Sequence, residues 1–85
     1  MSDADILAMI ERLTPVFRDV FDDDAVVITP ATSADDIQGW DSLAHIRLVT
    51  SIERVLDVRF TAAEVAALEN VGDLITLIFR KRGHG

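Results

Sequence analysis

The chain contains no cysteine. Disulfide bridges, cysteine-based zinc sites and a catalytic thiol of the protein's own are therefore excluded. It also lacks an apolar run of the ~18–20 residues that a membrane-spanning helix needs, and the start Met1–Asp5 is not typical of a signal peptide. We therefore expect a cytoplasmic protein that does not insert into a membrane. No metal site is expected either, because the consecutive acids Asp22–Asp24 lack the alternate spacing and central glycine of a calcium-binding loop.

Basic residues are scarce, with eight against fifteen acidic ones and a net charge of −7 over 85 residues. This balance argues against nucleic acid as a partner, and the net charge taken alone favours basic proteins, although it does not decide which sign of surface a partner presents to one helix. The acidic side chains are concentrated in residues 1–41, which carry a net charge of −8, whereas residues 42–85 carry +1. Apolar residues make up 49% of the chain. Because that is enough for one modest core, we expect one monomeric domain over residues 1–85, frayed in its last few residues.

The first apolar pattern, with steps of three and four residues, predicts a helix with one buried face. Ser2 is the expected N-cap, and the three consecutive acids Asp22–Asp24 should end the helix near Phe21, because negative charge is unfavourable at a helix C-terminus. Pro15 predicts either a kink or a break with a restart capped by Thr14.

Residues 25–41 are predicted to form a long connection, extended over Ala25–Thr29 and packed on the core. A connection of this length in a small domain is often functional. A second helix is predicted from Ser42 to Leu56, with Asp41 as N-cap. The residues expected to form its core-facing apolar stripe are Leu43, Ile46, Val49, Ile52 and Leu56, widened by Leu48 and Val55.

Two further helices complete the pattern. A capping box beginning at Thr61 predicts a short third helix that ends near Leu68. A last helix is expected after its cap Asn70, with three cations in its final turn and Gly83 as its stop. The fold class is therefore all-α, a four-helix bundle of three longer helices and one short helix, with a long loop between the first two.

Ser42 is the strongest candidate for chemistry. The unpaired N–H groups and the dipole at a helix start favour an anion, so a phosphate ester on this hydroxyl would be stabilised there. An ordinary capping role is the alternative. Asp41, Ser42 and His45 are the residue types of a hydrolase triad, but within one helical turn they cannot form the required relay. No catalytic residue is therefore predicted, and His45 is expected to be partly exposed on its helix.

The segment Gly39–Leu43 resembles the phosphopantetheine-attachment motif of acyl carrier proteins, in which Asp-Ser-Leu opens the second helix and the serine carries the prosthetic arm. The long loop before it and the short helix opened by Thr61 agree with that family. The resemblance extends from about Ile6 to Ile78, and the length of the chain matches a free-standing carrier.

The resemblance implies that a phosphopantetheinyl transferase moves 4'-phosphopantetheine from coenzyme A onto Ser42. The thiol of the arm would hold acyl or aminoacyl groups as thioesters, and the protein would pass them between acyl-transferring and acyl-modifying enzymes without catalysing a reaction. The imported thiol would account for the missing cysteine. The alternative function is a small helical protein–protein interaction module without a prosthetic group.

The predicted second helix departs from the fatty-acid carriers, which usually present an acidic surface there. Residues 42–56 carry a net charge of +1, and Arg47 stands where those carriers usually have glutamate. A specialised pathway therefore fits better, with polyketide, modified lipid, aminoacyl or surface-polysaccharide cargo all open. The residues predicted to take part in partner docking are Leu43, Ile46, Arg47 and Arg54, with acidic help from Asp35, Asp36 and Asp41.

Two features have both a structural and a functional interpretation. Trp40 could pack against the helix start or line the path of the arm, and we favour packing. The four alanines of the predicted third helix could allow close packing or leave a pocket for an acyl chain. Close packing is favoured, because protein interiors rarely keep voids.

Overall fold

The computed structural model describes residues 2–82. Helix α1 spans Asp3–Phe21, as predicted, and begins with a capping box in which Ser2 and Asp5 bond to each other's backbone N–H. The two hydrogen bonds from Ser2, first from its backbone and then from its side chain, lower the pKa of Asp5. The helix is continuous through Pro15, so of the two predicted alternatives the break is wrong, and the kink stays a prediction. The Thr14 hydroxyl instead donates to the carbonyl of Ile10 at 2.7 Å.

The connection after α1 is extended and packed on the core, as predicted. Val26 and Ile28 are buried while Val27 is exposed. Arg18 of α1 donates from Nε to the carbonyl of Val26 at 2.9 Å, which fastens the connection to the helix. The loop then forms one turn of 3-10 helix, η1 (Ala34–Asp36), which the sequence pattern did not predict.

Helix α2 spans Ser42–Leu56 with Asp41 as N-cap, and α4 spans Val71–Arg82 after a side-chain cap from Asn70, both as predicted. Helix α3 spans Ala62–Ala66 and is shorter than predicted, although its capping box is present. Gly83, the predicted stop of α4, and the last few residues, predicted to be frayed, lie outside the described residues.

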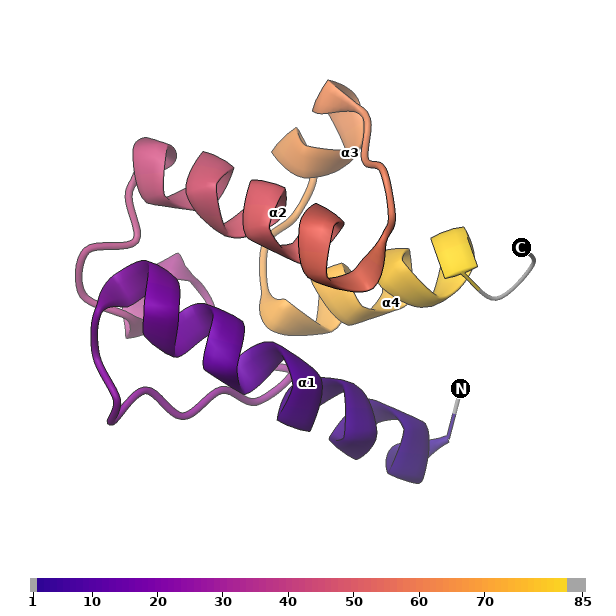
Figure 1. Cartoon of the computed structure of the whole chain (residues 1–85), viewed down its shortest axis with the longest axis horizontal. Helices are drawn as coiled ribbons and strands as arrows, with labels where there is room; N and C mark the ends of the chain where they lie inside the picture. Colours follow the sequence, from indigo (N-terminus) through magenta and orange to yellow (C-terminus); the bar gives the residue numbers. More distant parts are fainter. Residues whose placement is uncertain (1, 83–85) are drawn as a thin grey trace.

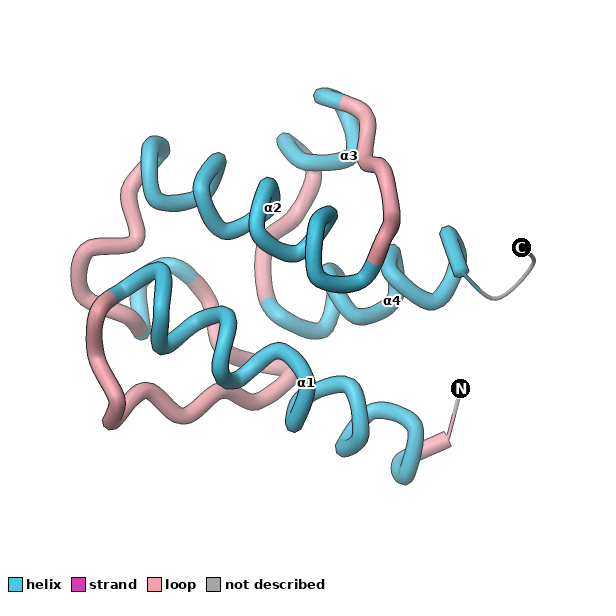
Figure 2. The backbone as a smooth tube through the Cα atoms, viewed as in Figure 1, coloured by secondary structure: helices cyan, strands magenta, loops and turns pink. Residues whose placement is uncertain are grey.

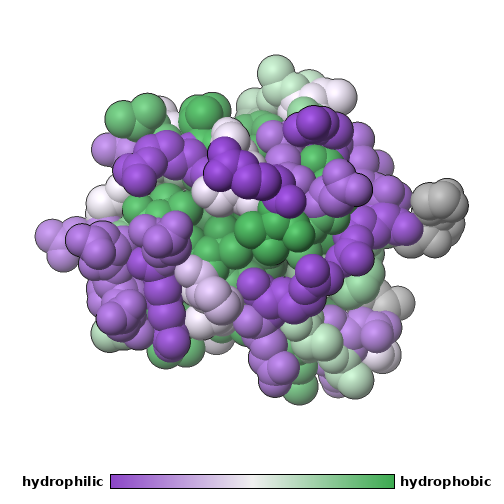
Figure 3. All heavy atoms as spheres, in the orientation of Figure 1, coloured by the Kyte–Doolittle hydropathy of each residue, from purple (hydrophilic) through white to green (hydrophobic). Residues whose placement is uncertain are grey.

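Helices α1 and α2 lie side by side and run in opposite directions, while α3 lies on the far side of α2 from α1 (Figures 1 and 2). The centre of the core is formed by side chains of α1, α2 and α4 that are almost completely inaccessible to solvent, namely Leu13, Phe17, Leu48, Ile52, Val71, Ile75 and Ile78. Helix α3 contributes no buried residue. On the face seen in Figure 3, hydrophobic residues form a band across the middle with hydrophilic residues above and below it.

The start of α4 is joined to the long loop by backbone hydrogen bonds. Val71 N–H donates to the carbonyl of Thr32, and Gly72 N–H donates to that of Pro30, both at 2.8 Å. A Cβ on Gly72 would lie 2.9 Å from the Pro30 oxygen, so this close approach requires glycine. Within the described residues the only β-type pairing is an isolated bridge between Ser33 and Asn70 at the same junction.

The exposed residues of α2 correct one prediction. Leu43, Ile46 and Val55, expected to face the core, are 69%, 56% and 53% exposed. Leu48, Val49, Ile52 and Leu56 are buried as predicted, and Ala44, which was not predicted, is buried with them. Leu43 and Ile46 therefore form part of the surface of the protein.

In the part of the chain that the structure describes, no helix is both long enough and apolar enough to cross a membrane.

Candidate functional site

Ser42 is the first residue of α2, and its side chain is exposed. Gly39, with a φ of 88°, forms the turn that leads into the helix. Asp41 caps the helix by accepting from the N–H of Ala44 at 2.8 Å, and its carbonyl accepts from the N–H of His45 at 2.9 Å. The serine hydroxyl is therefore presented at a rigid, capped helix start.

The backbone around Ser42 fits a covalently attached phosphate. Within residues 2–82, the N–H groups of Ser42 and Leu43 have no hydrogen-bond acceptor, because the first N–H groups of a helix have no partner within it and the Asp41 side chain bonds only to Ala44. Free N–H groups at the positive end of the helix dipole stabilise an anion. The start of α2 could therefore hold the phosphate of a phosphopantetheine ester without a further basic side chain.

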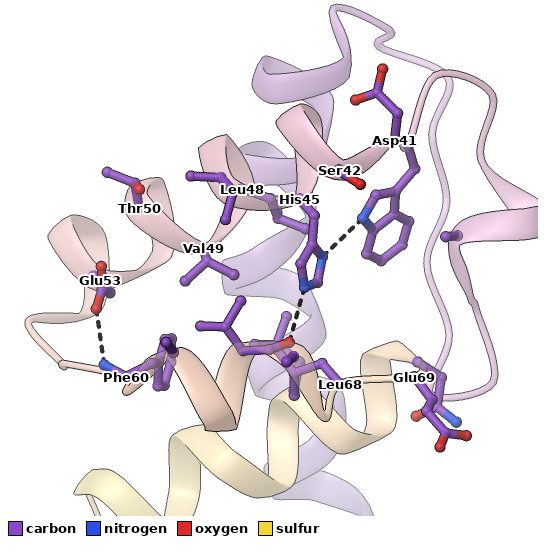
Figure 4. Close-up of a pocket in the computed structure, with 18 residues that line it drawn as sticks. Asp41, Ser42, His45, Leu48, Val49, Thr50, Glu53, Phe60, Leu68 and Glu69 are labelled. Carbon is purple, nitrogen blue, oxygen red and sulfur yellow. Dashed lines mark hydrogen bonds between the residues drawn. The ribbon is translucent and has the colours of Figure 1, made fainter.

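A cavity of about 720 Å³ opens next to Ser42, between α2, α3 and the start of α4 (Figure 4). Its walls are mostly apolar. The apolar side chains that contribute to them include Ile46, Val49, Phe60, Val65, Leu68 and Leu74. Ala62 and Ala66 also line it, so the favoured prediction that the alanines of α3 serve close packing is wrong for these two. Their small side chains leave the space open.

His45 lies in the wall of this cavity, one helical turn after Ser42. Its Nδ1 accepts a hydrogen bond from Nε1 of Trp40 at 3.1 Å, and its Nε2 lies 3.2 Å from the carbonyl oxygen of Val65 in α3. Both ring nitrogens are thus engaged (Figure 4). The side chain is half-buried, in agreement with the prediction that it is partly exposed.

The hydrogen bonds of His45 also exclude the triad alternative. Its two nitrogens are bonded to Trp40 and Val65, and the Asp41 carboxylate is bonded to the N–H of Ala44. Within the described residues, neither an Asp41–His45 nor a Ser42–His45 side-chain hydrogen bond is present. A Ser-His-Asp relay requires both.

Trp40 has a packing role and a place in the cavity wall at once. Its ring contacts Phe17 edge-on, with centroids 5.6 Å apart, and Phe21 at 5.7 Å. It also lines the cavity beside Ser42. The favoured interpretation of Trp40 as a packing residue is therefore compatible with the geometry, which also places the ring in the wall of the cavity that Ser42 lines.

Of the other predicted site residues, Asp41 and Ile46 line the cavity, and the rest lie outside it. Leu43, Arg47 and Arg54 are exposed on the outer side of α2, and Asp35 and Asp36 are exposed in η1. Asp36 accepts from the N–H of Ser33 at 2.9 Å, so its carboxylate closes the local turn. Ile46 is the one predicted docking residue of α2 that is both exposed and part of the cavity wall.

Helix α3 is fastened to its neighbours by a few polar contacts. Glu64 accepts from the N–H of Thr61 at 2.8 Å and pairs with Lys81 of α4 at 2.8 Å. These partners, first Lys81 and then the backbone of Thr61, lower the pKa of the Glu64 carboxyl. Glu53 of α2 accepts from the N–H of Phe60 at 2.9 Å, just before α3.

The residues of the far wall of the cavity were not predicted from the sequence. Phe60, Val65 and Leu68 are half-buried there, and Glu69 and Asn70 line its rim. The available signal was the apolar residues that flank the short alanine-rich helix. That pattern indicates an apolar face but does not show that the face borders an open space.

The acidic run after α1 has local backbone partners. Asp22 adopts a left-handed conformation that ends α1, and Asp23 accepts from the N–H of Ala25 at 2.9 Å. Among the described residues, no group of three or more His, Cys, Asp or Glu side chains could hold a metal ion.

Comparison with known proteins agrees with this geometry. Residues 11–78 match the family described as "Phosphopantetheine attachment site". A solved structure, the solution NMR structure of a holo acyl carrier protein from Geobacter metallireducens, is 47% identical in sequence. It superimposes with a TM-score of 0.82, over 88% of this chain and 86% of that one. The chain therefore belongs to the acyl carrier protein family, as a non-catalytic carrier with a covalent 4'-phosphopantetheine arm.

Proposed function

We propose that Ser42 is the residue that carries the 4'-phosphopantetheine arm, and that the chain is the substrate of a phosphopantetheinyl transferase. The observation that carries this proposal is the exposed hydroxyl at the first position of α2, beside two free backbone N–H groups and an apolar cavity. A transferase can approach the hydroxyl from solvent, and the helix start then stabilises the phosphate ester.

The attachment step uses the Ser42 hydroxyl as nucleophile. Its Oγ forms a bond to the phosphorus that bears pantetheine, the phosphoanhydride bond of coenzyme A breaks, and the nucleotide half leaves with the electron pair. The hydroxyl proton passes to a base of the transferase. Ser42 and Leu43 N–H groups then lie next to the new phosphodiester. When bound, the arm supplies a terminal thiol that holds acyl groups as thioesters.

The cavity is the proposed shelter for the cargo. Its walls are apolar, and Ser42 stands at its edge. Burying apolar surface contributes about 0.8 kcal/mol for each methylene group, so an acyl chain gains by leaving water there. An acyl or aminoacyl cargo of limited size fits this proposal. The alternative function, an interaction module without a prosthetic group, does not account for the cavity.

Intact-mass spectrometry tests the attachment site. The protein is incubated with coenzyme A and a broad-specificity phosphopantetheinyl transferase, and we expect a gain of one phosphopantetheine group. Ser42→Ala should show no gain. Ser51→Ala, which changes a half-buried serine later in the same helix, is the matched control and should be modified like the wild type. Absence of any gain, or modification of Ser42→Ala, would reject Ser42 and favour the interaction module.

The outer side of α2 is the proposed docking surface for the enzymes that load and modify the cargo. Leu43 and Ile46 expose apolar side chains beside Ser42, and Arg47 and Arg54 lie on the same side of the helix, seven residues apart. Between them, the exposed Thr50 is uncharged, and the carboxylate of the half-buried Glu53 accepts from the N–H of Phe60. A partner with an apolar contact flanked by acidic side chains is therefore complementary. The acidic contribution proposed for Asp35, Asp36 and Asp41 would come from the loop that precedes α2.

A charge reversal tests the docking surface. Arg47→Glu should weaken binding to the cognate acyl-transferring enzyme by roughly tenfold or more, and the effect should shrink at high salt, because exposed charges are screened. Arg59→Glu reverses an exposed arginine beyond the end of α2 and is the control. Equal affinity of Arg47→Glu and wild type would reject the arginine part of the surface.

The basic side of α2 supports a specialised biosynthetic pathway over housekeeping fatty-acid synthesis. Polyketide, modified lipid, aminoacyl and surface-polysaccharide cargo all remain within the proposal. The cytoplasmic location, the monomeric state and the single domain expected from the sequence stay predictions.

A further inference from the structure

A chain of two hydrogen bonds links three segments at the edge of the cavity. Trp40, before α2, donates from Nε1 to Nδ1 of His45 at 3.1 Å, and His45 Nε2 lies 3.2 Å from the carbonyl oxygen of Val65 in α3. A neutral imidazole has one donor and one acceptor nitrogen. Because Nδ1 accepts from the indole, the proton is on Nε2 and is donated to Val65. These partners fix the tautomer of the ring.

These two hydrogen bonds reach α3, a helix that has few contacts with the rest of the protein. Helix α3 has no buried side chain, and the polar contacts that fasten residues 60–66 to neighbouring helices are the bond of His45 to Val65, the Glu64–Lys81 pair and the Glu53–Phe60 bond. Of these three, only the His45 bond comes from the helical turn that carries Ser42. A hydrogen bond of usual strength changes a local opening equilibrium by several-fold to about tenfold.

The ring of His45 also connects two walls of the cavity. It is held from one side by Trp40, whose indole is itself packed on Phe17 and Phe21, and it reaches across to the opposite wall at Val65 (Figure 4). The position of Val65 relative to α2 therefore follows from a rigid aromatic anchor rather than from a flexible side chain.

We propose that His45 is a positioning residue that holds α3 at a fixed separation from α2, and thereby limits which acyl chains the cavity beside Ser42 can shelter. This inference rests on the proposed function, because it takes the cavity as the site of the cargo. Its structural half concerns only the protein, and it can be tested without any cargo.

Amide hydrogen exchange tests the structural half. His45→Phe keeps an aromatic ring but removes both hydrogen bonds, so exchange of the amides of residues 65–68 should accelerate by about tenfold while residues 13–20 of α1 stay unchanged. His45→Gln keeps one acceptor and one donor and should restore part of the protection. Wild-type exchange in His45→Phe, or equal acceleration in α1 and α3, would overturn the positioning role.

The tautomer provides a spectroscopic signature. Long-range ¹H–¹⁵N correlation spectra of the wild type should show Nε2 of His45 protonated and Nδ1 free of a proton. The opposite tautomer would contradict the hydrogen-bonded chain. Trp40→Phe should change the Nδ1 resonance, because it removes the donor.

Thioester protection tests the functional half. The carrier is loaded with acyl chains of increasing length, and the rate at which hydroxylamine cleaves each thioester is measured. We expect the wild type to protect chains up to a limiting length, and His45→Phe to shift that limit by at least one two-carbon step, with His45→Gln closer to wild type. An unchanged limit in His45→Phe would overturn the specificity role while leaving the proposed shelter intact. No protection of any chain in the wild type would reject the shelter itself.

Discussion

The two halves of this molecule are stabilised in different ways. In the half formed by α1, α2 and α4, side chains such as Phe17, Ile52 and Ile78 are completely buried against one another. In the half formed by α3 and the cavity, no residue of the helix is buried, and the segment is held by polar contacts and by the half-buried Phe60 and Leu68, which pack against the core. One half therefore supplies most of the buried apolar surface that stabilises the fold, whereas the other keeps an apolar cavity open beside Ser42. Helix α2 belongs to both, with one side in the core and the other beside the cavity.

A pair of isoleucines on α2 gives the largest contrast. Ile52 is 0% exposed and Ile46 is 56% exposed. Ile52→Ala should lower the free energy of unfolding by about 2–5 kcal/mol, because it leaves a hole in the core. Ile46→Ala should change it by no more than about 0.5 kcal/mol. Urea unfolding followed by circular dichroism measures both.

The milder Ile52→Val, with an expected loss of about 0.5–1.5 kcal/mol, keeps the comparison measurable if Ile52→Ala does not fold. Equal losses for Ile46→Ala and Ile52→Ala would mean that α2 does not divide the molecule in the way described.

Gly72 tests the junction of the loop with α4, within the well-packed half. Replacing a helical glycine by alanine normally stabilises a helix by about 1 kcal/mol. Here the added Cβ would lie 2.9 Å from the Pro30 oxygen and 3.2 Å from Asn70 Oδ1, so we expect Gly72→Ala to destabilise the protein by about 1–3 kcal/mol. Thermal unfolding measures the change. Thr76→Ala, at an exposed position of the same helix, should be nearly neutral. A stabilising Gly72→Ala would show that the junction yields easily.

Asp41 lies where the two halves meet. Substitutions of this residue can separate the contribution of the capping hydrogen bond to stability from that of the negative charge. Asp41→Ala should cost about 0.5–2 kcal/mol, because the N–H of Ala44 loses its acceptor. Asp41→Asn keeps a capping oxygen and should retain nearly the full stability. If Asp41→Asn is as unstable as Asp41→Ala, the charge rather than the cap stabilises the start of α2. Chemical denaturation of the two variants side by side distinguishes these outcomes.

The Glu64–Lys81 pair gives the smallest expected effect and belongs to the loosely held half. The pKa of Glu64 is lower in the folded protein than its usual value, so its contribution to stability is present above the unfolded pKa. That contribution disappears as the pH falls through the folded pKa. A carbon-detected NMR titration of the Glu64 carboxyl should show the lowered pKa, and Lys81→Met should bring it back toward the usual value. A pKa unaffected by Lys81→Met would leave the backbone of Thr61 as its main cause.

The sequence predicted the helices because their signals are local. Ser2, Asp41 and Thr61 each cap a helix through a backbone N–H only three residues away, and this spacing can be recognised in the sequence. The position of Ser42 at the start of α2 follows from the same local chemistry. The resemblance to the carrier family rests on that short segment and on the elements around it.

The features that could not be predicted from the sequence depend on which segments meet in space. Helix α2 has apolar residues around most of its circumference, so the pattern alone did not show that Leu48 faces the core while Leu43 faces solvent. The cavity is formed by three segments, and the sequence of one wall does not indicate its distance from the opposite wall. The contact between Trp40 and His45 joins a loop residue to a helix residue, which helical periodicity does not describe.

The hydrogen bonds from Val71 and Gly72 to the carbonyls of Thr32 and Pro30 connect points about forty residues apart in the chain. Each helix can form from neighbouring residues within microseconds, but this junction needs a long segment to close on itself, at a cost in chain entropy. We therefore expect the loop–α4 junction to form late in folding, after α1 and α2 have paired. On that order of events, substitutions at the junction would mainly speed unfolding and leave the folding rate almost unchanged.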